Sequence, residues 1–562
     1  MPNEYQVTNN VSVPLKLTYG FGALLLAIVV SCTNVPSEPA NGSSQEVSLE
    51  IAVTGGLVKG IVENGVKQYH GIPYAAPPLG DLRWAPPAPV LPWSGVRDAS
   101  EPGPICIQRA GAPIDFYSSA RPNPADSEDC LTLNVWTKAD RSDEGRPVMV
   151  WIHGGGLGAG WGARSAGSLY AEKGAVHVSI NYRLGKLGFF AHPELSEENP
   201  KGVSGNQGFR DQVQALEWVR DNITRFGGDP NNVTIFGESA GGISVAVMQA
   251  SPLARSLFHR GIGQSTPAFS PMQHRTRDQS FVPAGESIGL QFGAALAGEQ
   301  ANQSLAALRK VPAEKVLEVS ESNPMFSGYD FLPIVDGEVL VEDLGTTFAG
   351  GRQADVPMMV GNAAEEGAVV VPEMFMKSMG ADLQGFEKYG AAMLPEVSDE
   401  IPKYYPASAD EEVEQYWEAL FTDLSFNYPS RFWVRSMDGF QSEAYLYSFN
   451  WRPRLIGGKK SGPFHGSSQI YVHGDFDLFK EVEPDDADLQ FSNFIADIWV
   501  QFARTGNPNG GSLPEWPAFT PKNEAYMELG STLRVGHHLR MPQMELVEKA
   551  WAERRAANAP PP

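Results

Sequence analysis

The chain has 562 residues, enough for one large α/β domain or for several average ones, and its hydrophobic content of 42% can supply a sizeable core. Its 43 basic and 66 acidic residues give a net charge of −23. No basic stripe is present, which argues against a nucleic-acid partner, because phosphate binding needs clustered Lys and Arg. We interpret the acidity as a solubility property.

The first fifty residues have the pattern of an export signal followed by a tether. A lysine precedes an apolar run over residues 19–30, which is too short for a membrane span. The run ends in Val29-Val30-Ser31-Cys32, which resembles a bacterial lipoprotein cleavage box with Cys32 as the lipidated residue. We assign residues 1–32 to a signal peptide. Residues 33–46 are rich in Ser, Pro, Asn and Gly and predict a disordered tether.

This pattern predicts an exported protein, either periplasmic or attached to the outer membrane through lipid on Cys32. An ordinary secretory signal with an incidental cysteine, and hence a secreted protein, is the alternative. If lipid consumes Cys32, then Cys106 and Cys130 remain, which fits one disulfide in an oxidising compartment. Two buried free thiols are the alternative for this pair. Closing their loop would contribute roughly 3 kcal/mol.

Residues 47–550 have the pattern of one globular domain, and residues 551–562 predict a disordered tail. Apolar runs and strict alternation predict strands, and a 3.6-residue period predicts helices. A proline-rich stretch at 69–78 is interpreted as a loop, and an acidic stretch at 410–418 as a solvated helix face. The expected strands and the main helix are, in chain order, 51–53, 60–62, 131–136, 148–152, 176–182, 208–225 (the helix), 232–236 and 356–360. Alternation of this kind predicts an α/β sheet.

The strand at 232–236 leads into Gly237-Glu238-Ser239-Ala240-Gly241, and a helix-forming run follows it. Gly-x-Ser-x-Gly between a strand and a helix is the nucleophile elbow of α/β-hydrolases. Small neighbours are needed there because the backbone crowds around the serine. A glycine-rich turn with an incidental serine is the alternative, and the strand-turn-helix context disfavours it.

A serine nucleophile needs a base and an acid, and in this fold the chain order is Ser, then Asp or Glu, then His. Glu366 follows the strand at 356–360, which is where such folds keep catalytic groups, and Glu365 is its adjacent rival. Four histidines follow this point. His465, in a Gly-Pro-Phe-His-Gly loop, is the favoured base, and His473 is its rival.

A run of three glycines follows the strand at 148–152. His153-Gly154-Gly155-Gly156 has the form of the oxyanion loop of lipases and esterases, in which consecutive glycines let backbone N–H groups turn toward a developing negative charge. A phosphate-binding loop is the alternative. No Gly-Lys-Ser or Gly-Lys-Thr follows the run, which disfavours that alternative.

Together these residues resemble the type B carboxylesterase family, the carboxylesterase and cholinesterase group of α/β-hydrolases, in the form of a bacterial-type exported member. The resemblance spans about residues 50–545. Its further matching blocks are Gly71-Ile72-Pro73-Tyr74-Ala75, Glu128-Asp129-Cys130-Leu131, Asn181-Tyr182-Arg183-Leu184-Gly185, Gly205-Asn206-Gln207-Gly208, Phe226-Gly227-Gly228-Asp229-Pro230 and Phe502-Ala503-Arg504-Thr505-Gly506. The resemblance implies one large α/β-hydrolase domain with a mostly parallel central sheet. It also implies inserted helices over the active site, and the long stretch between the serine and the acid has room for them.

The resemblance implies a role for each candidate residue. Ser239 would be the acyl-forming nucleophile, Glu366 the triad acid and His465 the base. Glu238 resembles a pocket-lining acid of relatives, with a buried structural carboxylate as the alternative. Ser265 resembles a buried structural serine near the site.

The resemblance also implies an oxyanion hole made by the N–H groups of Gly155, Gly156 and Ala240, and a disulfide between Cys106 and Cys130. Two positions after the histidine depart from the family's pattern. Ser468 replaces the usual Glu or Asp, and His473 replaces the usual Phe. The loop from Cys106 to Cys130 contains no Trp, and Phe116 and Tyr117 are its aromatics, which disfavours choline specificity.

We therefore expect a carboxylic-ester hydrolase that acts on a small-molecule ester through an acyl-serine intermediate, with no metal and no organic cofactor. Amide, carbamate or thioester hydrolysis is an alternative, because all of these reactions pass through a tetrahedral oxyanion. A non-catalytic binding protein on the same fold, like the neuroligins, is disfavoured because the three triad residues are present. Leu157, Trp161, Phe326 and Phe331 are candidate pocket residues that we interpret as core.

Overall fold

The computed structural model describes residues 48–108, 124–298, 303–322, 333–455, 462–479, 482–510 and 514–558. The predicted signal peptide, Cys32 and the tether lie outside these residues, as do Phe116, Tyr117, Phe326 and Phe331.

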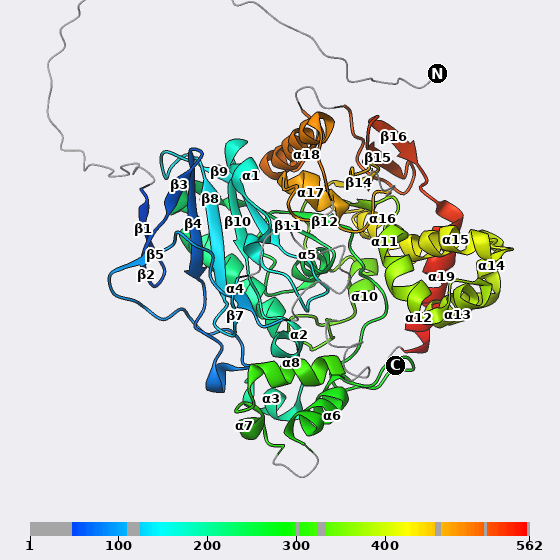
Figure 1. Ribbon diagram of the computed structural model, residues 1–562, viewed down its shortest axis with the longest axis horizontal. Helices are drawn as coiled ribbons and strands as arrows, with labels where there is room; N and C mark the ends of the chain where they lie inside the picture. Colours follow the sequence, from blue (N-terminus) through cyan, green and yellow to red (C-terminus); the bar gives the residue numbers. More distant parts are fainter. Residues whose placement is uncertain are drawn as a thin grey trace, which may run out of the picture.

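The described part of the chain folds around a sheet of eleven strands (Figure 1). Its order from one edge to the other is β16 (Arg534–His537), β15 (Ala525–Leu529), β14 (Ala444–Phe449), β13 (Met358–Ala363), β12 (Arg260–Gln264), β11 (Gly228–Glu238), β9 (Arg146–Ile152), β10 (Val176–Ile180), β8 (Thr132–Thr137), β4 (Val66–Pro73) and β3 (Ile61–Glu63). The strands from β15 to β10 are parallel, and both ends of the sheet are antiparallel. This is the mostly parallel α/β sheet that the sequence predicts.

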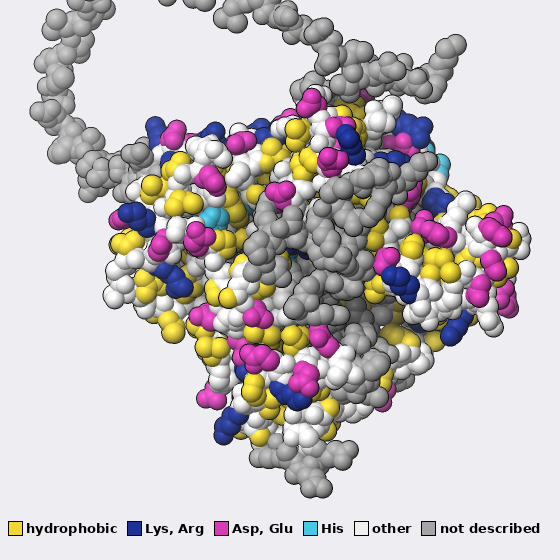
Figure 2. Space-filling view, viewed as in Figure 1, with side chains coloured by type: hydrophobic (Ala, Val, Ile, Leu, Met, Phe, Trp, Pro, Cys, Tyr) yellow, Lys and Arg dark blue, Asp and Glu magenta, His cyan; other side chains and the backbone are white. Residues whose placement is uncertain are grey.

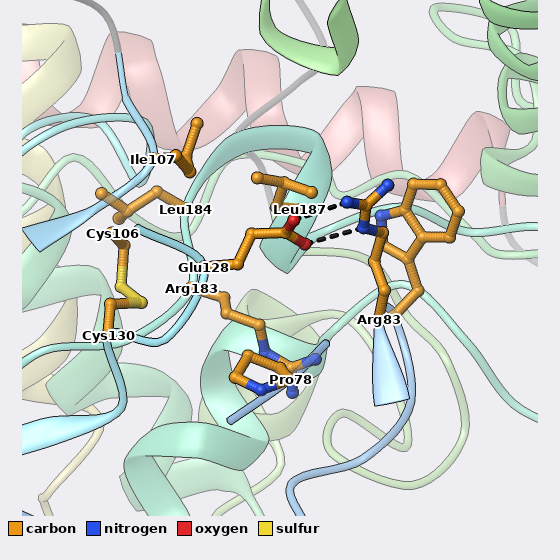
Figure 3. Close-up of a pocket in the computed structure, with 10 residues that line it drawn as sticks. Pro78, Arg83, Cys106, Ile107, Glu128, Cys130, Arg183, Leu184 and Leu187 are labelled. Atoms are coloured by element: carbon orange, nitrogen blue, oxygen red, sulfur yellow. Dashed lines mark hydrogen bonds and ion pairs between the residues drawn. A yellow bond between two sulfur atoms is a disulfide. The ribbon is translucent and has the colours of Figure 1, made fainter. Parts of the chain in front are cut away.

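Two small sheets accompany the central one. The first is built from β1 (Glu50–Val53), β2 (Gly56–Lys59) and β5 (Val96–Asp98), and the second from β6 (Ile105–Cys106) and β7 (Asp126–Ser127). The second sheet lies beside the disulfide between Cys106 and Cys130, whose Cα atoms are 5.0 Å apart. In Figure 3 this disulfide lines a small pocket together with the buried ion pair of Arg83 and Glu128, in which Arg83 Nε donates to Glu128 Oε1 at 2.7 Å. The predicted pairing of these two cysteines is therefore present.

Helices cover both faces of the sheet (Figure 1). One face is covered by α1 (Ser168–Glu172), α17 (Ser467–His473) and α18 (Asp486–Thr505). The other face is covered by α4 (Gln207–Asn222), α5 (Ala240–Ala250), α10 (Leu344–Ala349), α16 (Tyr428–Arg435) and α19 (Met541–Ala557). Strand β9 explains why both layers form. Met149 and Trp151 pack into the first layer, while Val148 and Val150 pack into the second, so an uninterrupted apolar run is buried on both faces as predicted.

Two groups of shorter helices extend from this core (Figure 1). The first contains α2 (Gly185–Gly188), α3 (Pro193–Glu198), α6 (Gly285–Ala297), α7 (Leu305–Leu308) and α8 (Ala313–Ser322). The second contains α11 (Gly367–Val370), the π-helical turn η5 (Val371–Met376), α12 (Lys377–Met379), α13 (Leu383–Met393), α14 (Ile401–Tyr404) and α15 (Asp410–Thr422). Helices α6, α7, α8 and α10 occupy the long stretch between Ser239 and Glu366, as predicted. Within the described residues, no helix combines the length and apolarity that crossing a bilayer requires.

The described residues also contain short 3₁₀ turns. They are η1 (Gly80–Leu82), η3 (Gly162–Arg164), η4 (Ile223–Phe226) and η6 (Pro395–Glu400).

Two local predictions are wrong. The stretch at 69–78, interpreted as a loop, contains most of β4, because Tyr69 and Ile72 are fully buried against β8 and the prolines stand at and beyond the strand's end. The tail expected to be disordered from residue 551 is helical to Ala557. Trp551 is 4% exposed and packs edge-on against Tyr428, which gives the last turns of α19 a buried anchor.

Candidate active site

Ser239 lies on a sharp turn between β11 and α5, as the Gly-x-Ser-x-Gly pattern predicts. Its backbone has a φ of 57° and a ψ of −120°, a conformation that non-glycine residues rarely adopt. A Cβ on Gly237 would lie 2.5 Å from the backbone of Gly241, and a Cβ on Gly241 would lie 2.0 Å from the carbonyl oxygen of Ile152. Both flanking positions therefore require glycine.

The hydroxyl of Ser239 contacts His465, and His465 contacts Glu366. The Nε2 atom of His465 lies 3.0 Å from Ser239 Oγ, and its Nδ1 lies 2.6 Å from Glu366 Oε2. Glu366 is fully buried, and its other oxygen accepts a hydrogen bond from the N–H of Ala363 at 2.7 Å. Three side chains that are far apart in the sequence thus form one hydrogen-bonded chain.

Backbone hydrogen bonds and an aromatic ring hold the histidine loop against the acid's loop. The N–H of His465 donates to the carbonyl oxygen of Glu366 at 3.3 Å, and the N–H of Glu365 donates to that of Pro463 at 3.2 Å. Phe426, from the π-helical turn η7 (Asp423–Asn427), packs against the imidazole with ring centroids 4.9 Å apart. The imidazole is therefore fixed at its edges by hydrogen bonds and on one side by an aromatic ring.

The two rival residues lie elsewhere. His473, at the end of α17, is 2% exposed and packs against the ring of Trp151 with centroids 4.4 Å apart, in the apolar layer of α17 and α18. Burial lowers the pKa of His473 to about 3. Glu365 forms an ion pair with Arg452, and its side chain is 38% exposed. The geometry therefore favours His465 over His473 as the base, and Glu366 over Glu365 as the acid.

Glu238 places a second carboxylate beside the histidine. It is 2% exposed, its Oε2 accepts a hydrogen bond from Gln469 Nε2 at 2.6 Å, and its Oε1 lies 3.5 Å from His465 Nε2. Burial raises the pKa of Glu238 to about 7. Burial by itself would lower the pKa of His465, but the charges of Glu238 and Glu366 outweigh it and raise that pKa to about 9.

The glycine run after β9 lies against the serine turn. A Cβ on Gly154 would lie 2.6 Å from the carbonyl oxygen of Glu238 and 3.2 Å from Ser239 Cβ, so the backbone approaches more closely than a side chain permits. Gly155 and Gly156 follow with φ of 110° and 64°. Ala240 begins α5, and the first N–H groups of a helix have no helical acceptor. The glycine run and the start of α5 therefore both lie next to Ser239.

His153 anchors the start of this glycine run. Its imidazole stacks on Tyr182 with centroids 4.4 Å apart, and the Tyr182 hydroxyl donates to the carbonyl oxygen of His153 at 2.8 Å. Burial lowers the pKa of His153 to about 4, so the ring is neutral at ordinary pH. The role of this histidine in the fold is therefore to hold the loop.

Several residues around the site were not identified from the sequence. Phe426 and Gln469 are the clearest cases, because each contacts a residue that is distant in the chain and neither belongs to a recognisable motif. Ser265 is 1% exposed with a φ of 45°, and Leu157 and Trp161 are buried, in agreement with the interpretation of all three as structural residues.

Comparisons with known proteins agree with this geometry. The model of the carboxylesterase family matches residues 45–547. The fumonisin B1 esterase of Sphingopyxis macrogoltabida is 33% identical over 539 residues, covering 93% of this chain and 94% of that protein. Carboxylesterase 1D of Mus musculus is 34% identical over 528 residues, covering 87% of this chain and 89% of that protein.

Solved structures give the same result. A PNB esterase structure superposes with a TM-score of 0.76 at 30% identity, covering 89% of this chain and 99% of that one. A thermophilic PNB esterase has the same TM-score and identity. The chain therefore belongs to the carboxylesterase family, has the α/β-hydrolase fold and is a carboxylic-ester hydrolase.

Proposed function

We propose that Ser239, His465 and Glu366 hydrolyse a carboxylic ester through an acyl-serine intermediate. The observation that carries the proposal is the continuous chain of contacts, 3.0 Å from Ser239 Oγ to His465 Nε2 and 2.6 Å from His465 Nδ1 to Glu366 Oε2. A buried carboxylate on Nδ1 fixes the imidazole tautomer with Nε2 free to accept the serine proton. It also stabilises the imidazolium that forms.

The reaction would proceed in two halves. In the first, His465 takes the proton of Ser239, whose oxygen attacks the ester carbonyl. The alcohol leaves with the proton that the imidazole returns to it. In the second half, the same imidazole takes a proton from water, the resulting hydroxide attacks the acyl-serine, and the acid is released as the proton returns to Ser239.

The N–H groups of Gly155, Gly156 and Ala240 would bind the negative oxygen of each tetrahedral intermediate. Support comes from the close approach of Gly154 to Ser239 and from the position of Ala240 at the start of α5. Loss of one such donor typically costs about 10²–10³ in turnover. The substrate is proposed to be a small-molecule ester. The relatives described above are named as esterases, which favours an ester over an amide or a thioester.

A serine variant tests the proposal. Ser239→Ala should lose p-nitrophenyl acetate turnover and labelling by a fluorophosphonate probe, because Ser239 supplies the hydroxyl that contacts His465 Nε2. Ser244→Ala is the control, since Ser244 is a buried serine on α5 whose hydroxyl donates to the carbonyl of Ala240. If Ser239→Ala keeps the turnover and the labelling of the wild type, Ser239 is not the nucleophile.

A pair of histidine variants tests the base. His465→Ala should lose turnover, whereas His473→Ala should retain it in the folded fraction, because His473 lies in the apolar layer and away from the serine. The reverse order of activities would contradict the assignment.

We also propose that the protein is exported and lipidated on Cys32. The apolar run, the Val-Val-Ser-Cys sequence and the tether support export, and a disulfide between Cys106 and Cys130 is typical of an oxidising compartment. Labelling with a radioactive fatty acid should mark the wild type and not Cys32→Ser. Equal labelling of both would exclude this attachment.

A further inference from the structure

One short segment touches both loops of the proposed triad. The Oγ1 atom of Thr422 accepts a hydrogen bond at 3.3 Å from the N–H of Gly367, directly after the acid. On the other side of the acid's loop, Asn427 Oδ1 accepts a hydrogen bond from Asn362 Nδ2 at 2.8 Å. Between these contacts, Phe426 packs against the imidazole of the base. The segment 422–427, which comprises the last residue of α15 and the turn η7, therefore reaches the acid from both sides.

The contact at Asn362 leads directly to the catalytic carboxylate. Asn362 Nδ2 also donates to the carbonyl oxygen of Ala363 at 2.9 Å, and the N–H of Ala363 donates to Glu366 Oε1 at 2.7 Å. A movement of segment 422–427 would therefore shift the peptide that holds Glu366. Asn362 and Asn427 are both buried, so water cannot easily replace this contact.

Segment 422–427 is itself held by a buried charge. Asp423 is fully buried and accepts hydrogen bonds from Arg540 Nε at 2.7 Å, Arg540 Nη2 at 2.5 Å, Tyr405 at 2.8 Å and Asn427 Nδ2 at 2.7 Å. Arg540 stands just before α19, and its side chain is 37% exposed. Helices α11, α15 and α19 lie together at one end of the molecule (Figure 1). The chain of contacts thus runs from a partly exposed arginine to the nucleophile.

We propose that the Arg540–Asp423 ion pair is a positioning device for catalysis, which fixes segment 422–427 and through it the acid and the base relative to Ser239. This inference rests on the triad proposed above. Its basis is connectivity, since one set of hydrogen bonds links Arg540 to Asp423, Asn427, Asn362 and the peptide that binds Glu366. The buried pair of Arg183 and Asp211, at 2.7 Å, differs, because among the described residues the Asp211 carboxylate accepts hydrogen bonds from Arg183 alone.

Geometry explains why arginine is needed. Its planar guanidinium grips the Asp423 carboxylate through two nitrogens, whereas a lysine ammonium is a point charge without a fixed direction. Arg540→Lys would keep the charge of the pair and loosen its orientation. Because displacements near 1 Å can cost about 10²-fold in rate, a small rotation of segment 422–427 is enough to affect turnover.

The test compares Arg540→Lys with Thr422→Val, which removes only the acceptor for the Gly367 N–H. Arg554→Ala is the matched control, because Arg554 lies on α19 and makes a bidentate ion pair with Glu396, and among the described residues neither side chain hydrogen-bonds to segment 422–427. All variants are made in the full chain. For each we measure kcat, KM, the pH profile of kcat/KM and the thermal midpoint, with kcat normalised to folded protein by circular dichroism.

We expect Arg540→Lys to lower kcat about tenfold with KM changed less than about twofold, and to shift the acid limb of the pH profile. Arg554→Ala should lower the thermal midpoint without either kinetic effect. Thr422→Val should lower kcat, and the double variant should lose less than the product of the two single losses, because both act through one segment.

A normal kcat and pH profile in folded Arg540→Lys, with only a lower thermal midpoint, would overturn the inference. If Arg540→Lys does not fold, Thr422→Val decides, and an unchanged kcat in that variant would overturn it equally. Ser239→Ala separates this result from a failure of the triad. Turnover that persists in Ser239→Ala contradicts the triad itself, whereas turnover that requires Ser239 but not Arg540 or Thr422 contradicts only the positioning role.

Discussion

At the scale of single residues, the charges around His465 set the pH range in which it can act as a base. The imidazole accepts the serine proton only when it is neutral, and with a pKa raised to about 9 it is mostly protonated at pH 7. We therefore expect kcat/KM to rise with pH up to about 9. Glu238→Gln removes one of the two negative charges responsible, so it should move this rise to lower pH.

The control for this prediction is Glu365→Gln, which alters a neighbouring carboxylate that pairs with Arg452 at the surface. Its pH profile should match that of the wild type. If the pH profile of kcat/KM in Glu238→Gln is the same as that of the wild type, the charge of Glu238 does not affect the pKa of His465.

A second residue-scale prediction concerns stability in acid. His473 is neutral and buried, and its pKa falls from 6.5 to about 3 on folding, so its contribution is complete above pH 6.5 and declines as the pH falls below it. The loss is at most about 1.4 kcal/mol for each pH unit. His473→Phe keeps a ring against Trp151 without a titratable group.

We therefore expect the drop in thermal midpoint between pH 7.5 and pH 5 to be smaller in His473→Phe than in the wild type. His538→Phe serves as the control, because the His538 side chain is 55% exposed. An equal drop in His473→Phe and the wild type would show that the buried ring has no part in acid sensitivity.

At the scale of elements, the serine turn depends on its two glycines. In Gly241→Ala the new Cβ would meet the carbonyl oxygen of Ile152, so α5 has to move away from β9 and take the turn with it. We expect kcat to fall by about 10² or more while the helix content by circular dichroism stays near that of the wild type. Gly285→Ala is the control, because its nearest atom belongs to the flexible Ile334 side chain at 3.3 Å. Full activity in Gly241→Ala would contradict the close approach of α5 to the backbone of Ile152.

Some elements of the site could be predicted from the sequence, whereas others could not. The turn at Ser239, the strand β9 and the glycine run are predictable because short-range steric and periodic constraints determine them. Phe426 was not identified, because its contact with the imidazole exists only once η7 and α16 have packed beside β13. Strand β4 was misread, since its prolines suggested a loop while its burial comes from pairing with β8.

The triad residues are an intermediate case. Chain order and the loop motifs reduce the candidates for the acid to Glu366 and its rival Glu365, and those for the base to His465 and its rival His473. The family resemblance then favours Glu366 and His465. The pattern alone left His473 open as the base, since burial in the layer of α17 and α18 is a tertiary property. The disulfide partners were predictable, because only two cysteines follow Cys32.

At the scale of the whole molecule, the disulfide ties β6 of the small two-stranded sheet to the segment directly before β8 of the central sheet. Cys106 and Cys130 are separated by 24 residues, and closing a loop of that size stabilises the folded state by about 3 kcal/mol. Reductant should therefore lower the thermal midpoint of the wild type to that of the Cys106→Ser/Cys130→Ser variant. The variant should not respond to reductant, and a wild type that is equally unresponsive would contradict the stabilisation.

Charge is also a property of the whole surface. Acidic side chains are spread over the face seen in Figure 2 and are not gathered in one patch, which agrees with the interpretation of the net charge of −23 as a source of solubility.

The strand order of the central sheet has a kinetic consequence. Strand β12 ends at Gln264 and pairs with β13, which begins at Met358, and β13 pairs in turn with β14, which begins at Ala444. Such pairings form only after long stretches of chain have been closed into loops, which slows folding and exposes unpaired strands to aggregation. Heat-denatured protein should therefore recover poorly on cooling. The stability of the protein is then kinetic, so its half-life at a given temperature is set by the rate of unfolding. The thermal midpoints of variants should therefore be compared at one heating rate.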